Sequence, residues 1–155
     1  MPATPPVLAP VQSCDFEAML KLRIAALRES LERLGRFDPA RARERLAAGF
    51  APQHMHHIEV DGQRVGFVTL RPDLIQQPAS LRLDHLYLVP NAQGRGVGSW
   101  VIGWAKAQAH RRDIQVSALQ HSDANRFYLR HGFVKTAERD FDIDYCWSPE
   151  GGVPA

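Results

Sequence analysis

The run LDHLYLVPNAQGRGVGS, residues 83–99, carries the strongest structural signal in this chain. It starts as an apolar segment rich in β-formers, which stops at Pro90, and it continues through a glycine turn into a helical pattern. A strand, a glycine turn and a helix in this order suit a pyrophosphate. Glycines let backbone N–H groups approach the anion, and the helix N-terminus adds about half a positive charge. The run therefore predicts a nucleotide-type cofactor.

A glycine turn of this kind has three other interpretations, which the sequence fits to different degrees. A dinucleotide-binding fingerprint needs a glycine or alanine one place after Gly98, where this chain has Ser99, and it belongs near the first strand of its domain. A phosphate loop of the Gly-Lys-Ser/Thr type is excluded, because no such triplet follows the turn. The third interpretation is an ordinary helix N-terminus whose glycines allow close packing.

Hydrophobic periodicity and capping residues predict two helices in the first third of the chain. Apolar residues recur every three or four positions over residues 15–34, which is typical of a helix, and Gly35 ends it. Asp38 as N-cap and Pro39 in the first position begin a second, basic helix that runs to Gly49.

The remainder of the chain alternates strands with two more helices. Asp61-Gly62 is a favoured two-residue hairpin turn. We expect helices over residues 97–109 and 124–131, and strands over residues 7–11, 57–60, 64–71, 81–89, 114–119, 133–138 and 141–147. The order β-α-α-β-β-β-α-β-α-β-β predicts an α/β fold with a mixed sheet in a single domain over residues 1–155. Its Pro/Gly-rich ends, residues 1–5 and 148–155, are expected to fray.

Composition bounds the class of protein. The 155 residues are 45% hydrophobic and 23% charged, as in a soluble globular domain. A net charge of +2 gives no case for binding nucleic acid or a membrane surface. Cys14 and Cys146 form neither a metal motif nor a disulfide framework, and no signal-peptide pattern or long apolar run is present. We therefore expect a cytoplasmic protein.

Two motifs together carry a family resemblance. The segment QGRGVG, residues 93–98, fits the pattern Q/R-x-x-G-x-G/A; it follows LYLVP and precedes FYLRHGF at residues 127–133. Over residues 81–147 the chain closely resembles the GNAT superfamily of N-acetyltransferases. The resemblance implies one N-acetyltransferase domain with a splayed central sheet and acetyl-CoA as cosubstrate.

The resemblance also implies where acetyl-CoA binds. The pyrophosphate is expected on the turn formed by Gln93, Gly94, Arg95, Gly96, Val97, Gly98 and Ser99. The backbone of Leu86, Tyr87 and Leu88 is expected to pair with the pantetheine arm like an added strand, and one of these amides polarises the acetyl carbonyl. Without the resemblance, these three residues would be a plain buried strand and Arg95 a solvated side chain.

Tyr128 is the implied general acid. A phenol with a pKa of about 10 can protonate a departing thiolate whose own pKa is about 8.5. The alternative is a core tyrosine with a satisfied hydroxyl group. The chain departs from the family at a position near Tyr128. Many relatives have an asparagine there whose amide bonds the cofactor, whereas this chain has His121. Asn125 is a second candidate for the contact with the cofactor, and its alternative interpretation is a solvated helix residue. Where some relatives have a glutamate base, this chain has Val116.

The base must therefore come from elsewhere. Asp84 is the first candidate, because a carboxylate in an apolar strand is costly unless it is used or paired, and other relatives carry a basic side chain there. The alternative is a salt bridge, with Arg82 for instance. His85 is the second candidate, since its unperturbed pKa is about 6.5. Strand alternation places the His85 side chain on the face of the sheet opposite to that of Asp84, unless a bulge in the strand inverts this order. A water relay is the third.

Two other clusters attract a functional interpretation. His54, His56 and His57 lack a carboxylate or cysteine at ligand spacing, so we expect surface histidines and no metal site. The series Asp140, Asp142 and Asp144 either lines an acceptor-amine site or, as alternation with Phe141, Ile143 and Tyr145 favours, lies on the exposed face of a half-exposed strand.

The predicted reaction is direct acetyl transfer in a ternary complex to a small-molecule or peptide amine. The sequence does not identify that amine, and a homodimer is possible but not indicated by the sequence. Two rivals belong to other classes: a non-catalytic acyl-CoA-binding or sensor domain, favoured by His121 and Val116, and a nicotinamide enzyme, disfavoured by Ser99.

Overall fold

The computed structural model describes residues 4–73, 75 and 80–149, so the expectation of frayed ends falls outside it for residues 1–3 and 150–155. Within the described residues there are four α-helices: α1 Phe16–Arg33, α2 Pro39–Ala48, α3 Val97–Ala109 and α4 Ala124–Arg130. Short 3-10 turns occupy η1 Ser13–Asp15, η2 Pro52–His54 and η3 Pro90–Ala92. The strands are β1 Val7–Pro10, β2 Met55–Val60, β3 Gln63–Asp73, β4 Ser80–Leu88, β5 Ile114–Leu119, β6 Val134–Glu138 and β7 Asp142–Trp147.

The predicted α/β fold and element order are confirmed. The seven strands of the described residues form one sheet in the order β1-β2-β3-β4-β5-β7-β6. It is mixed: β4 pairs with β5 in parallel, from Leu81↔Ile114 to Leu83↔Val116, whereas β7 runs antiparallel to β5 and to β6. The chain divides into two compact units, Met1–Thr69 with His85–Trp100 and Leu70–Asp84 with Val101–Ala155.

Local signals place the elements of the first unit. The Asp38 carboxylate accepts hydrogen bonds from the amides of Ala40 and Arg41, which caps α2 as predicted. Asp61 and Gly62 both have positive φ, so the β2–β3 hairpin turns as its sequence requires. The buried core of this unit joins α1, α2, β2, β3 and the residue that follows β1, through Val11, Met19, Leu20, Ala42, Leu46, Met55 and Phe67.

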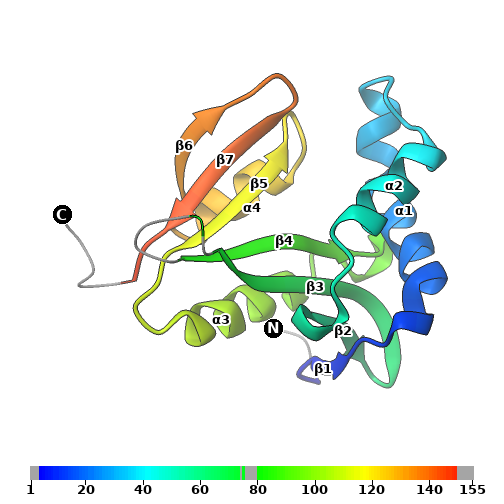
Figure 1. Ribbon diagram of the computed structural model, residues 1–155, viewed down its shortest axis with the longest axis horizontal. Coiled ribbons are helices and arrows are strands. Elements are labelled where there is room, and N and C mark those ends of the chain that lie inside the picture. The colour runs from blue at the N-terminus through cyan, green and yellow to red at the C-terminus, as the bar shows by residue number, and fades with distance from the viewer. Residues whose placement is uncertain (1–3, 74, 76–79, 150–155) are drawn as a thin grey trace. The chain divides into compact units, whose positions relative to one another are not determined.

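The second unit contains β5, β7 and β6, which run side by side (Figure 1). Its buried apolar side chains come from both helices and strands and include Val101, Ala105, Ile114, Val116, Ala118, Tyr128 and Tyr145. Gly132 has φ +87 and lets the chain reverse after α4, which brings Phe133 back against Tyr128. The FYLRHGF motif is thus a helix end, a left-handed turn and an aromatic anchor.

Two expectations about side-chain environment need correction. The buried positions of α1 are Met19, Leu20 and Arg23, so the apolar stripe is narrower than predicted and includes a charged residue. The last strand begins at Asp142, and Phe141 just before it is 50% exposed, so the predicted alternation holds only at Tyr145.

Of the helices in the described part of the chain, none combines the length and the apolar character that crossing a bilayer requires.

Candidate acyl-CoA site

The glycine turn lies between β4 and α3, in the first unit. Gly94 and Gly96 have φ angles of +74 and +85, a conformation that non-glycine residues rarely adopt. The Gln93 side chain donates from Nε2 to the Leu88 carbonyl oxygen at 2.8 Å, which ties the turn back to the end of β4. A Cβ atom at Gly94 would meet no atom within 4 Å, so backbone conformation rather than packing requires glycine there.

Helix α3 presents the start of its amide ladder to this turn. The Trp100 N–H donates to the Gly96 carbonyl at 3.0 Å, and this hydrogen bond closes the first turn of the helix. The amides of Val97 and Gly98 precede that bond, and such first-turn amides have no intrahelical acceptor. Together with the helix dipole they form an anion-binding geometry. Arg95, on the exposed tip of the turn, adds a positive charge.

The strand segment Leu86–Leu88 approaches its neighbour very closely. A Cβ atom at Gly66 of β3 would lie 1.9 Å from the carbonyl oxygen of Tyr87 and 2.9 Å from its carbonyl carbon. Only glycine permits this contact, so Gly66 fixes the position of the strand expected to pair with pantetheine. Sequence reasoning missed Gly66; its one signal was a lone glycine inside a strand pattern.

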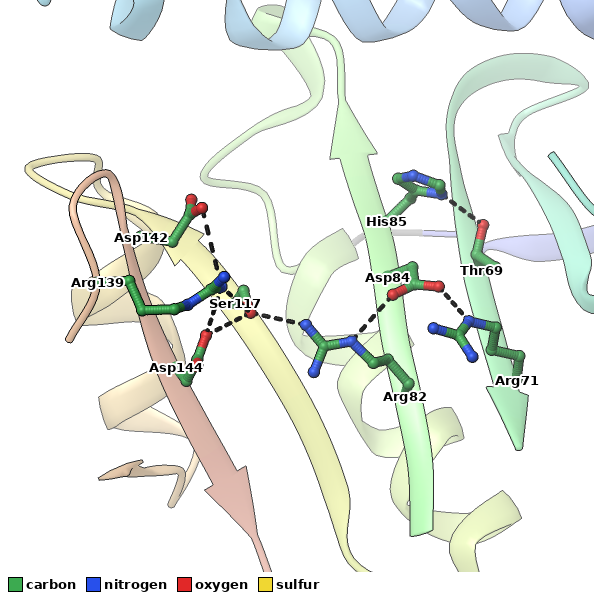
Figure 2. Close-up of polar contacts among 9 residues, drawn as sticks. All are labelled: Thr69, Arg71, Arg82, Asp84, His85, Ser117, Arg139, Asp142 and Asp144. Atoms are coloured by element: carbon green, nitrogen blue, oxygen red, sulfur yellow. Dashed lines mark hydrogen bonds and ion pairs between the residues drawn. The ribbon is translucent and has the colours of Figure 1, made fainter. Parts of the chain in front are cut away.

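Asp84 is ion-paired with two arginines. Arg71 Nε donates to Oδ2, and Arg82 Nε donates to Oδ1 at 3.1 Å, so both carboxylate oxygens accept from guanidinium groups (Figure 2). The salt-bridge alternative for Asp84 is therefore present in the structure, with Arg71 as a second partner that the sequence did not indicate.

The Asp84 pair belongs to a longer polar network in the second unit. Arg82 Nη2 donates to Ser117 Oγ at 2.8 Å, and Ser117 Oγ donates to Asp144 Oδ1 at 2.6 Å (Figure 2). Arg139 Nη2 donates to the same Asp144 oxygen at 2.9 Å and lies 3.9 Å from Asp142 Oδ2. Burial acts to raise the pKa of Asp144, but the hydrogen bonds from Ser117 and Arg139 leave it below its ordinary value.

This network revises the interpretation of the aspartate series. Asp144 and Asp142 are half-buried and pair with Arg139, while Asp140 lies exposed before the strand. The series is therefore neither a plain solvated face nor a row of unpaired carboxylates.

His85 occupies a different environment from its neighbour Asp84. Its Nδ1 lies 2.9 Å from Thr69 Oγ1, and the side chain is only 9% exposed (Figure 2). Its ring packs against Phe67 and Tyr87, and its Cε1 would lie 3.2 Å from a Cβ atom at Gly49. Burial alternates from Leu83 through Asp84 to His85, as in a regular strand, so the difference between the two environments requires no bulge.

Tyr128 is buried in the aromatic cluster of the second unit. It is 7% exposed, and its ring centroid lies 5.4 Å from that of Phe127, 5.3 Å from that of Phe133 and 6.2 Å from that of Tyr145. These contacts fix the orientation of the phenol ring, which a proton donor requires.

Asn125 is held by its own chain. Its Nδ2 donates to the carbonyl oxygens of Leu119 and Ser122 at 2.9 Å, and its Oδ1 accepts from the Tyr145 hydroxyl group at 2.7 Å. It is thus a half-buried clamp on the loop after β5 and not a solvated helix residue. His121 lies exposed in the same loop with φ +69, and Val116 is buried at 1% exposure.

The expectation of surface histidines is wrong for His57. Its side chain is fully buried, and Nε2 lies 2.8 Å from Asp15 Oδ2. That hydrogen bond is the main cause that lowers the pKa of Asp15. His54 and His56 are half-buried, and desolvation lowers the pKa of His56. Across the described ranges, no three His, Cys, Asp or Glu side chains are grouped so as to hold a metal ion.

Comparison with known proteins assigns the family. Residues 51–135, more than half of the chain, match the model of the acetyltransferase (GNAT) domain. The matched region includes β4, the glycine turn, α3 and α4. The chain therefore belongs to the GNAT family, which is a family of acyltransferases.

A curated relative agrees with this assignment. The chain is 26% identical over 102 residues to an aminoalkylphosphonate N-acetyltransferase of Salmonella typhimurium. The match covers 61% of this chain and 66% of that protein, just under two thirds of its length.

Solved structures agree on the fold. An acetyltransferase from Thermus thermophilus superposes with a TM-score of 0.77 at 15% identity, over 96% of this chain and 100% of that one. The PaiA N-acetyltransferase from Thermoplasma acidophilum, solved in complex with coenzyme A, gives a TM-score of 0.72 at 12% identity over 93% and 99% of the two chains.

Proposed function

We propose that this protein transfers an acetyl group from acetyl-CoA to a primary amine. The observation that carries the proposal is the turn between β4 and α3: two glycines with positive φ precede a helix N-terminus, within the region that matches the GNAT family. Anion binding by such a turn needs backbone amides and no special side chain, which explains why glycine rather than charge dominates the motif.

In this proposal the pyrophosphate is held by the turn, which consists of Gln93, Gly94, Arg95, Gly96, Val97, Gly98 and Ser99. Leu86, Tyr87 and Leu88 pair through their backbone with pantetheine, and one of their amides stabilises the oxyanion. Gly66 supports this role, because the close approach of β3 leaves the Tyr87 backbone little room to move. His121 and Asn125 are proposed to lie near the cofactor. Because the Asn125 amide already bonds to Leu119 and Tyr145, its proposed role is to shape the loop after β5 rather than to contact the cofactor with that amide.

The reaction proceeds in one ternary complex. A base removes a proton from the acceptor ammonium, and the amine nitrogen attacks the thioester carbonyl. The carbon–sulfur bond then breaks, and the electron pair leaves with sulfur. Tyr128 donates its proton to that thiolate, so the products are an N-acetyl amide and CoA.

Between the two candidate bases, His85 is favoured. Both oxygens of Asp84 already accept from guanidinium groups, whereas an imidazole is a side chain of the kind that exchanges a proton near neutral pH. Once His85 has taken a proton, directly or through a water, both ring nitrogens are donors, and Thr69 Oγ1, 2.9 Å from Nδ1, can accept a hydrogen bond from the imidazolium. Asp84 then serves to hold Arg71 and Arg82 in place.

A second function, acyl-CoA binding without catalysis, is favoured by two observations. The buried Val116 replaces a glutamate found in some relatives, and Asp84 is locked in ion pairs. Thiol release from acetyl-CoA in the presence of a panel of primary amines separates the two functions. Amine-dependent release supports the enzyme. Saturable acetyl-CoA binding without release on any amine supports the binding domain.

A further inference from the structure

Arg23 is the one arginine or lysine of the described residues whose side chain is buried, at 7% exposure. It projects from α1 into the first unit, where its Nη1 donates to the Ala42 carbonyl oxygen of α2 at 3.2 Å. Its guanidinium carbon lies 5.4 Å from the ring centroid of Tyr87 on β4. The guanidinium group is therefore held between two helices and the strand proposed to carry the acyl arm.

This charge has no counterion among the described residues. No carboxylate lies within 4.0 Å of Arg23, and its buried Nε has no hydrogen-bond partner there. By contrast Arg71 and Arg82, which are more exposed, both pair with Asp84. A guanidinium group removed from water without an anion is costly, and buried charges in proteins are normally paired. One carbonyl and one aromatic face do not supply the missing negative charge.

The geometry points to an anionic group on the acceptor: we propose that Arg23 binds the acid group of a small amine that carries a carboxylate or a phosphonate. A planar guanidinium matches such groups with two parallel hydrogen bonds. Arg23 touches Tyr87, and the neighbouring Leu86 and Leu88 belong to the same proposed acyl-binding segment. The acid end of the acceptor is thereby anchored beside the strand that carries the thioester. This inference rests on the proposed acetyl transfer and names its substrate class.

The test compares matched amines on the full-length protein. The pairs are 3-aminopropanoate with propylamine and 2-aminoethylphosphonate with ethanolamine, each assayed by thiol release from acetyl-CoA. Wild type is expected to prefer the acidic member of each pair in kcat/KM by about 10- to 100-fold, the range that a charged hydrogen-bonded contact supports. Equal turnover of the two members overturns the proposal and leaves acetyl transfer intact.

Two substitutions at Arg23 and one elsewhere locate the preference. Arg23→Gln removes the charge and is expected to abolish the preference by raising KM for the acidic amines, with KM for acetyl-CoA unchanged. Arg23→Lys keeps the positive charge but not the two parallel N–H donors of the guanidinium group, and it is expected to retain part of the preference for acidic amines. Arg28→Gln, on the same helix but with 58% of its side chain exposed, is the control. A folded Arg23 variant that keeps the full preference overturns the proposal.

A binding measurement separates this inference from acetyl transfer itself. The thermal midpoint of the CoA-bound protein is followed with and without each amine, for wild type and Arg23→Lys. If no amine is acetylated but the acidic amines alone stabilise wild type more than the variant, the anion site stands and the transfer proposal fails. If neither acidic amine is acetylated preferentially or stabilises wild type, the anion site is rejected.

Discussion

Gly66 and Tyr87 are in such close contact that a single methyl group at Gly66 would lie 1.9 Å from the Tyr87 carbonyl oxygen. The obstacle is backbone rather than a flexible side chain, so β3 or β4 must move to accept any larger residue. Gly66→Ala is therefore expected to destabilise the protein by about 1–3 kcal/mol through overpacking and to weaken acetyl-CoA binding. Denaturant unfolding and a CoA titration check both effects.

Gly103 supplies the matched control for that substitution. It lies exposed in α3, and an added Cβ atom would meet nothing within 4 Å. Gly103→Ala is expected to stabilise the protein by about 0.5–1 kcal/mol, because alanine favours a helix interior. If Gly66→Ala did not lower the free energy of unfolding, as is expected of Gly103→Ala, the close approach of β3 to Tyr87 would be disproved.

Tyr128 and Tyr145 are neighbours in one aromatic cluster, but they have different proposed roles. Tyr128→Phe is expected to lower kcat by roughly 10²–10⁴-fold with the KM for acetyl-CoA little changed, since only the proton donor is lost. Tyr145→Phe loses the hydrogen bond to Asn125 and is expected to cost about 1 kcal/mol of stability with a far smaller effect on kcat. Equal kcat values in the two variants would assign Tyr128 to the core alone.

The proposed roles of Asp84 and His85 can be distinguished by two substitutions that change each side chain little in size. Asp84→Asn leaves Arg71 and Arg82 without their shared anion and is expected to cost about 1–3 kcal/mol of stability, with a modest effect on rate. His85→Gln is expected to lower kcat/KM by roughly 10²–10⁴-fold, because the variant has no group that takes the proton from the acceptor ammonium. A stable Asp84→Asn enzyme without activity, beside an active His85→Gln enzyme, would exchange the two assignments.

Asp15 couples stability to acidic pH. The hydrogen bond with His57 holds the pKa of Asp15 below its ordinary value, so the folded state binds a proton there less readily than the unfolded state. Its contribution to stability is complete above the unfolded pKa of about 3.9 and is lost as pH falls through the lower, folded value. Wild type is therefore expected to exceed Asp15→Asn in thermal midpoint at pH 7 and to lose that advantage below about pH 4.

Glu29→Gln is the control for the acid series, because the Glu29 side chain is 93% exposed. It is expected to follow wild type at every pH. An Asp15→Asn midpoint that stays below wild type by a constant amount from pH 7 to pH 3 would contradict the role of the Asp15–His57 pair.

The elements of this fold could be predicted because their signals are local. Asp38 and Pro39 begin α2, and Asp61-Gly62 turns the β2–β3 hairpin, each through chemistry contained in two or three adjacent residues. The glycine turn was recognisable for the same reason, since positive φ at Gly94 and Gly96 is a property of those residues alone.

The environments of single side chains could not be predicted, because they depend on partners distant in sequence. His57 is buried against Asp15, and Arg23 lies against Tyr87; each pair is joined only by folding. Periodicity assigned Arg23 to no buried face, since an arginine in a helix is usually solvated. The second partner of Asp84, Arg71, comes from another strand and left no sequence signal.

The central claim is that the backbone amides of residues 94–99 hold the pyrophosphate of CoA, and calorimetric titration with CoA tests it most directly. Gly96→Ala is compared with Gly62→Ala, a substitution that imposes the same positive-φ strain in a hairpin with open space around it. We expect Gly96→Ala to weaken CoA binding by at least about tenfold and Gly62→Ala to leave it unchanged. Wild-type affinity in a folded Gly96→Ala protein would contradict the account.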